Sequence, residues 1–344
     1  MNSRRLLAGT VHLLRNGTCV AFAGTSGATQ NSLVFDREMK KRQRDWAFSQ
    51  SDYDAAQYLK EEIGWRVADK VFDLTKFNQL VLDIGCGSGY IAPHLIKENV
   101  GKIIQVDMSR KMVENSKGCD DERVEVERRC VDEEKLDGFE ENQFDLLVTS
   151  MSAHWINALP QWFHRCHQIL KPDCPFIGSM LAEDTLYELR CSLQLAEMER
   201  LGGVGSHISP FVRSQDVGGL LNSAGFDMIT LDSDEIEVGF PNMFALMYDL
   251  QLMAESHCTH RRSLTLRRDV LLAAEAIYKS MYAKDTVYPA TFKIISFIGW
   301  KKGPNSPKPA KRGSQSVSLK DIGKIVEDPE LMRKISEDSG KKNK

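Results

Sequence analysis

Short apolar runs alternate with amphipathic stretches along the first half of the chain. Strands are predicted at residues 79–84, 103–107, 124–131, 144–150 and 176–180. The first is a buried strand, and the fourth is apolar almost throughout, as a central parallel strand should be. Residues 157–170 carry apolar side chains at helical spacing, and Lys171-Pro172-Asp173 stops that helix. A helix is also expected over about 52–72 and another after Ser88, while residues 36–46 are strongly charged. This alternation predicts a parallel sheet covered by helices.

The pattern changes after Met180. Helices are predicted at 184–200, 216–224, 241–255 and 267–282, and two further strands at 229–238 and 291–300. The residues from Lys301 onward are rich in Lys, Ser, Pro and Gly, which is typical of a mobile tail. We divide the chain into a leader (1–32), a helical segment (33–75), a core (76–182), a substrate-side region with the last strands (183–300) and a basic tail (301–344).

The leader has the composition of a targeting segment. Three arginines and no acid precede Asp36, and Leu7, Val11 and Leu14 fall on one helical face. This pattern predicts a mitochondrial transit peptide. The alternative is a secretory signal cleaved near Ala21-Phe22-Ala23, although Arg15 ends its apolar run early.

Composition narrows the class of protein. The 344 residues carry a net charge of −3, which gives no electrostatic reason to expect nucleic acid as a partner. No run approaches the roughly 20 apolar residues that cross a bilayer. The eight cysteines include no C-x-x-C pair, which argues against a zinc ribbon and predicts reduced thiols.

The first predicted strand runs into the loop Asp83-Ile84-Gly85-Cys86-Gly87-Ser88-Gly89. Alternate glycines let the backbone approach a ligand closely, because no Cβ stands in the way. A dinucleotide fingerprint would need a further glycine where Tyr90 stands. An acid ahead of G-x-G-x-G instead resembles motif I of class I methyltransferases. That resemblance implies S-adenosylmethionine binding through Asp83, Gly85, Gly87 and Gly89, whereas a plain strand-to-helix turn is the alternative.

Two further acids fall at the ends of later strands. Asp107 ends the second predicted strand, where one carboxylate can accept hydrogen bonds from both ribose hydroxyls. Asp132 ends the third, where similar proteins place an acid against the adenine amino group, and Glu133 is its neighbour. Because the carboxyl ends of parallel strands form the ligand edge of such a sheet, we add Met108 and Ser150 to the predicted cofactor site.

Later segments carry a more specific resemblance. Residues 144–173, with the glycine loop and Phe35-Asp36-Arg37, resemble the methyltransferase group that includes the malonyl-carrier-protein methyltransferase of biotin synthesis. Residues 184–197, 207–211 and 298–301 look like the mitochondrial complex I assembly factor five family, a match that extends over about 33–325. The implied fold is the class I S-adenosylmethionine-dependent methyltransferase (Rossmann-like) fold, α/β, with a seven-stranded mostly parallel sheet and a helical insertion.

The same resemblance implies an activity. Members of the family hydroxylate an arginine on a peripheral-arm subunit of complex I, in the mitochondrial matrix at the inner membrane, and work with a small assembly-factor partner. The residues alone indicate methyl transfer, because no histidine is followed two positions on by an acid, as an iron oxygenase site usually begins. No metal site is predicted. A methyltransferase of a protein, carrier or small molecule and a non-catalytic scaffold are the alternatives.

Four residues are predicted on the substrate side. His154 and Trp155 follow the fourth strand, where class I enzymes present groups to the acceptor, although a lone histidine is often structural. Asp184 and Tyr187 lie on the next predicted helix. A guanidinium is planar and always charged, so we expect Asp184 with its acidic neighbours to pair with it, and Trp155 and Tyr187 to stack on it. An exposed salt-bridged face is the alternative.

Overall fold

The structure is a computed structural model that describes residues 33–262 and 265–307. The predicted leader and most of the predicted tail lie outside the described residues. The chain from Val34 onward forms one unit, which contains every helix and strand named below.

One seven-stranded sheet organises this unit, with the order β3-β2-β1-β4-β5-β7-β6. The first five strands are parallel, and β7 runs antiparallel to both of its neighbours, β5 and β6. The bounds are β1 Asn78–Ile84, β2 Val100–Asp107, β3 Glu125–Cys130, β4 Leu146–Ser150, β5 Pro175–Leu181, β6 Phe226–Phe240 and β7 Tyr288–Lys301. The predicted strand positions and the mostly parallel sheet are confirmed, and the class I methyltransferase fold with them.

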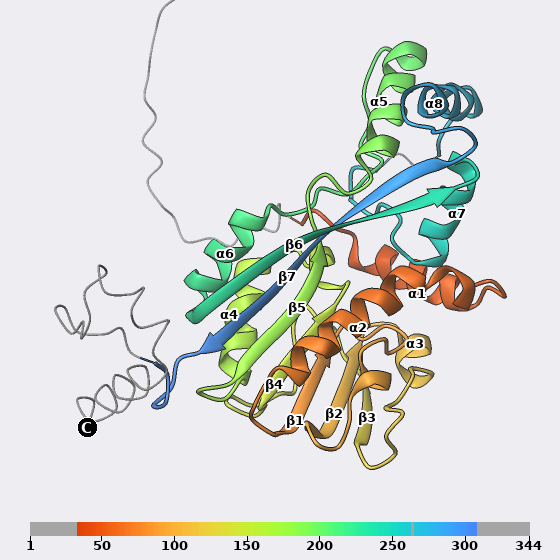
Figure 1. The fold of residues 1–344 in the computed structure, drawn as a ribbon. Helices are drawn as coiled ribbons and strands as arrows, with labels where there is room; N and C mark the ends of the chain where they lie inside the picture. The colour runs from red at the N-terminus through yellow and green to blue at the C-terminus, as the bar shows by residue number, and fades with distance from the viewer. Residues whose placement is uncertain (1–32, 263–264, 308–344) are drawn as a thin grey trace, which may run out of the picture. The chain divides into compact units, whose positions relative to one another are not determined.

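Helices cover both faces of the sheet (Figure 1). Side chains of α4 and α6 pack into one core with the strands, and side chains of α2 pack into another core against β1, β2 and β4. The helices are α1 Arg37–Phe48, α2 Tyr58–Phe72, α3 Arg110–Glu114, α4 Leu159–Ile169, α5 Tyr187–Leu201, α6 Ser214–Ser223, α7 Met243–Leu252 and α8 Arg268–Met281. Short 3-10 turns occur at Asp54–Ala56, Ala92–His94 and Ala153–Trp155.

The two long antiparallel strands carry the helical insertion. In Figure 1, β6 and β7 run past the end of β5 toward α5, α7 and α8. A third core joins these helices to the far ends of both strands, through Phe240 on β6 and Phe292 on β7. The insertion is thus tied to the sheet by the same strands that complete it.

Two local features differ from the sequence-based expectation. The helix predicted after Ser88 is wrong, because only the 3-10 turn Ala92–His94 forms there. Pro93 lacks the N–H that an α-helix needs at that point. The charged stretch 36–46 instead folds as α1, whose N-cap Asp36 accepts a hydrogen bond from the Met39 N–H.

Within the described ranges, none of the helices is both long and apolar enough to span a membrane. The seven cysteines described there are free thiols.

Gly178 offers a test of the packing between β4, β5 and β7. A Cβ at this position would lie 2.4 Å from the Phe297 ring and 2.6 Å from the Thr149 methyl. We expect Gly178→Ala to lower the free energy of unfolding by about 1–3 kcal/mol, measured by urea denaturation. Gly219→Ala on exposed α6 is the control, because no atom lies within 4 Å of its added Cβ. The control should be stabilised by roughly 0.5–1 kcal/mol, and equal effects of the two changes would contradict the packing argument.

Candidate functional site

The glycine loop after β1 has a backbone that only glycine adopts easily. Gly85, Gly87 and Gly89 have φ values of 70°, 54° and 77°. A Cβ on Gly85 would lie 2.1 Å from the Ser152 hydroxyl oxygen, and one on Gly89 would lie 2.5 Å from a backbone oxygen of Lys117. At Gly87 the nearest atom would be 3.8 Å away. Neighbouring atoms therefore leave no room for a side chain at either end of the loop, whereas there is space beside its central glycine.

Asp83, at the end of β1, has an unsatisfied carboxyl group. The residue is fully buried, and neither carboxylate oxygen has a hydrogen-bond partner among the described residues. Burial, and then the neighbouring Asp107, raise the pKa of Asp83 to about 8. The hydroxyl of Ser150, at the end of β4, is also buried without a partner. Buried polar groups are normally paired, so these two mark a place for a polar ligand.

Asp107, at the end of β2, is fully paired. It accepts the backbone N–H of Gly87 at 3.0 Å and that of Ser109 at 2.7 Å. Its two oxygens also lie 3.1 Å from one guanidinium nitrogen of Arg44, which reaches in from α1. Burial raises the pKa of Asp107, and the Arg44 charge offsets part of that shift.

Glu133 is the second acid in the cleft. It accepts the Met108 N–H at 3.1 Å and lies 2.7 Å from Arg44 and 2.8 Å from Arg37. Burial favours the neutral acid, but the two arginines outweigh it and lower the pKa of Glu133. The neighbouring Asp132 is partly exposed and pairs with Arg37 at 3.1 Å. Of the two acids predicted after β3, the buried one is therefore Glu133.

His154 and Trp155, after β4, both bind Glu255, which follows α7. The His154 Nδ1 atom accepts the Leu181 N–H, so its Nε2–H donates to Glu255 Oε2 at 3.0 Å. The Trp155 indole N–H donates to the same oxygen at 3.0 Å. Lys60 lies 3.5 Å from Oε1. Although burial opposes the charge, His154 and the nearby lysines lower the pKa of Glu255 and keep it ionised.

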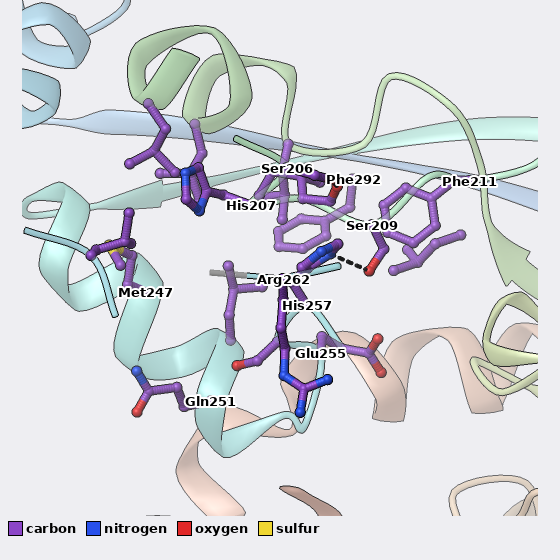
Figure 2. Close-up of a pocket in the computed structure, with 18 of the residues that line it drawn as sticks. Ser206, His207, Ser209, Phe211, Met247, Gln251, Glu255, His257, Arg262 and Phe292 are labelled. Carbon is purple, nitrogen blue, oxygen red and sulfur yellow. Dashed lines mark hydrogen bonds between the residues drawn. The ribbon is translucent and has the colours of Figure 1, made fainter. Parts of the chain in front are cut away.

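Glu255 lines a cavity of about 230 Å³ between the insertion and the sheet. Figure 2 shows Glu255, His257 and Arg262 from the loop after α7, together with the rings of Phe211 and Phe292. Leucines of α5, α7 and β5 form more of the wall. The cavity thus has an apolar wall and a polar side. Glu255 is the one acid among the described lining residues, and the Arg262 guanidinium on the same side pairs with Asp36 at 3.1 Å.

The structure does not bring the predicted arginine-binding residues together. Asp184 is mostly exposed and lies 3.9 Å from Lys293. Tyr187 is exposed and packs edge-on against Tyr282. Neither residue lines the cavity. Trp155 is buried, so its ring is not exposed to stack on a substrate guanidinium.

Arg44 and Glu255 were not predicted from the sequence. Arg37, Lys40 and Arg44 are spaced three and four apart, a helical pattern that places them on one face of α1. That spacing could have been noticed, but a charged helix usually faces solvent. Glu255 could not have been found, because about 100 residues separate it from His154 and Trp155. No cluster of His, Cys, Asp and Glu suited to a metal ion lies in the described part of the chain.

Known proteins resemble this chain over most of its length. Residues 82–177 match the model of a methyltransferase domain. A Danio rerio protein named arginine-hydroxylase NDUFAF5, mitochondrial, is 51% identical over 86% of this chain and 91% of its own length. The Homo sapiens protein of that name is 50% identical over 88% and 86%. A malonyl-[acyl-carrier protein] O-methyltransferase from Methylovorus sp. is 29% identical over 79% and 92%. The chain thus belongs to the family of mitochondrial arginine hydroxylases named NDUFAF5, built on a methyltransferase domain.

Proposed function

We propose that this chain hydroxylates an arginine side chain on a peripheral-arm subunit of mitochondrial complex I. The observation that carries the proposal is the 50–51% identity to proteins named as arginine hydroxylases, over most of both chains. The complex I substrate, a matrix location at the inner membrane and a small assembly-factor partner follow from the resemblance of residues 184–197 and 207–211.

We propose S-adenosylmethionine as the cofactor, held at the switch point between β1 and β4. The open glycine loop, the unpaired carboxyl of Asp83 and the unpaired hydroxyl of Ser150 fit such a ligand. When bound, it supplies a sulfonium and an ammonium charge, and either would favour the ionised form of Asp83. Asp107 and Glu133 are the acids for its ribose and adenine.

We place the substrate arginine in the cavity beside Glu255. An arginine has an apolar stem and a planar cation with five donors, so its receptor needs apolar walls and an acceptor. The leucines and Phe211 supply the walls, and Glu255 supplies the acceptor. His154 and Trp155 are positioning residues, because both bind one oxygen of Glu255 and leave the other to Lys60 at a long 3.5 Å.

Replacement of Glu255 tests the substrate site. In cells that lack the protein, we expect Glu255→Gln to restore less than about a tenth of the arginine hydroxylation that the native chain restores, since it removes the charge that pairs with the guanidinium. Asp184→Asn is the matched control and should restore it fully. The measurement is mass spectrometry of peptides from complex I subunits, with the thermal stability of each variant checked.

Each result has a distinct meaning. Loss with Asp184→Asn but not with Glu255→Gln would move the substrate to the exposed face of α5. A gain of one methylene instead of one oxygen would make the protein a methyltransferase. Restored complex I without any arginine modification would support the scaffold alternative.

Asp83→Asn tests the cofactor site through pH. The pKa of Asp83 is about 8 in the folded protein and near 3.8 in the unfolded chain. As the pH rises between these values the unfolded chain loses its proton first, so Asp83 lowers the stability of the ligand-free protein progressively. Relative to the native chain, Asp83→Asn should gain at least about 1.4 kcal/mol in unfolding free energy between pH 5 and pH 8. It should also bind S-adenosylmethionine more weakly by calorimetry. If the unfolding free energies of the two proteins changed with pH in parallel, Asp83 would not be a buried, unpaired carboxyl group.

Import tests the proposed location. Residues 1–32 fused to a fluorescent reporter should deliver it to the mitochondrial matrix, and Arg4, Arg5 and Arg15 changed to Gln should leave it in the cytosol. Microscopy and protease protection of isolated mitochondria give the readout. Secretion of the native fusion would favour the signal-peptide alternative.

A further inference from the structure

Both oxygens of the Asp107 carboxylate are already engaged within the chain. A carboxylate offers about four lone-pair sites. The N–H groups of Gly87 and Ser109 use one on each oxygen, and Arg44 lies 3.1 Å from both oxygens. Two ribose hydroxyls need the same two sites. Arg44 and a nucleoside therefore compete for Asp107.

The Arg44 side chain is held in this position by burial and by further polar contacts. Its side chain is 8% exposed, and it also contacts Glu133 at 2.7 Å and the Ser152 hydroxyl at 3.3 Å. Burial opposes its charge, but Asp107 and Glu133 outweigh burial and raise the pKa of Arg44. Seven residues earlier, about two turns back along α1, Arg37 pairs with Glu133 and Asp132. The acids predicted for ribose and adenine are thus all paired with α1.

The same helix is anchored to the loop that forms the substrate cavity. The buried Lys40 ammonium donates to the backbone oxygens of Ala254 and Ser256, at 2.8 and 2.9 Å. It also lies 3.3 Å from the centre of the Trp155 ring. Glu255 and Ser256 line the cavity. A movement of α1 that withdraws Arg44 would therefore strain the contacts of Lys40 with this loop.

We propose that α1 is a latch between the two sites: Arg44 holds the ribose-binding acid in the ligand-free protein, and S-adenosylmethionine binds only when α1 releases it. The inference rests on the proposed cofactor. Release of α1 also loosens Lys40 from residues 254–256, so cofactor binding opens the substrate cavity. The latch thereby orders the two binding events, with cofactor before substrate.

Hydrogen exchange of the native full-length chain tests the latch without any mutation. Amide exchange over residues 37–48 is followed by mass spectrometry, with and without saturating S-adenosylhomocysteine. We expect the amides of α1 to exchange at least about threefold faster with ligand, and those of residues 254–258 to follow, since α1 is released. Slower exchange over 37–48 would show instead that α1 closes on the ligand, and would overturn the latch.

Arg44→Gln gives a second readout, with Arg42→Gln as the matched control on the exposed face of the same helix. Removal of the competing guanidinium should tighten S-adenosylhomocysteine binding by roughly tenfold or more in calorimetry, whereas Arg42→Gln should leave it unchanged. Equal or weaker binding by a folded Arg44→Gln protein would overturn the latch while leaving the cofactor proposal intact.

If Arg44→Gln does not fold, the hydrogen-exchange result decides. Absence of binding by all three proteins would overturn both proposals, while binding by Arg44→Gln alone would establish the latch.

Discussion

The burial of several carboxylates at one edge of the sheet is the constraint on which the rest of this protein depends. A buried carboxylate must be neutralised by a proton or a cation, because water is not there to solvate it. Asp83 takes the first course, with a pKa of about 8. Asp107 and Glu133 take the second, through Arg44. Glu255 combines a lysine with two neutral donors. The position of α1 therefore depends on the pairing of Arg44 with these buried carboxylates as much as on its apolar contacts.

Much of the fold, and the acids of the proposed cofactor site, could be predicted from the sequence. The carboxyl ends of parallel strands meet at one edge, so Asp83, Asp107 and Glu133 converge there once the strands are identified. Local pattern is enough for this step, because β1, β2 and β4 are largely apolar and the edge strand β3 is recognised by its place in the alternation.

The residues on the substrate side could not be predicted in the same way. The chain turns through left-handed backbone at Asp184 and Leu186, with φ values of 69° and 55°. These turns direct α5 so that Leu189 and Leu193 face the cavity while Tyr187 faces outward. A helical wheel gives the relative faces of α5 but not which of them points inward. The contacts of Glu255 and Arg44 likewise depend on how distant segments pack.

The contact between Arg44 and Asp107 has a consequence for how related chains can diverge. Loss of either partner alone leaves the other charged and buried, which costs more than loss of both. Changes at these two positions are therefore strongly non-additive and should occur together among homologues. A homologue that lacks the acid at position 107 should therefore also lack the basic residue at position 44. The two positions together would then indicate which homologues keep the proposed exchange between Arg44 and a ligand.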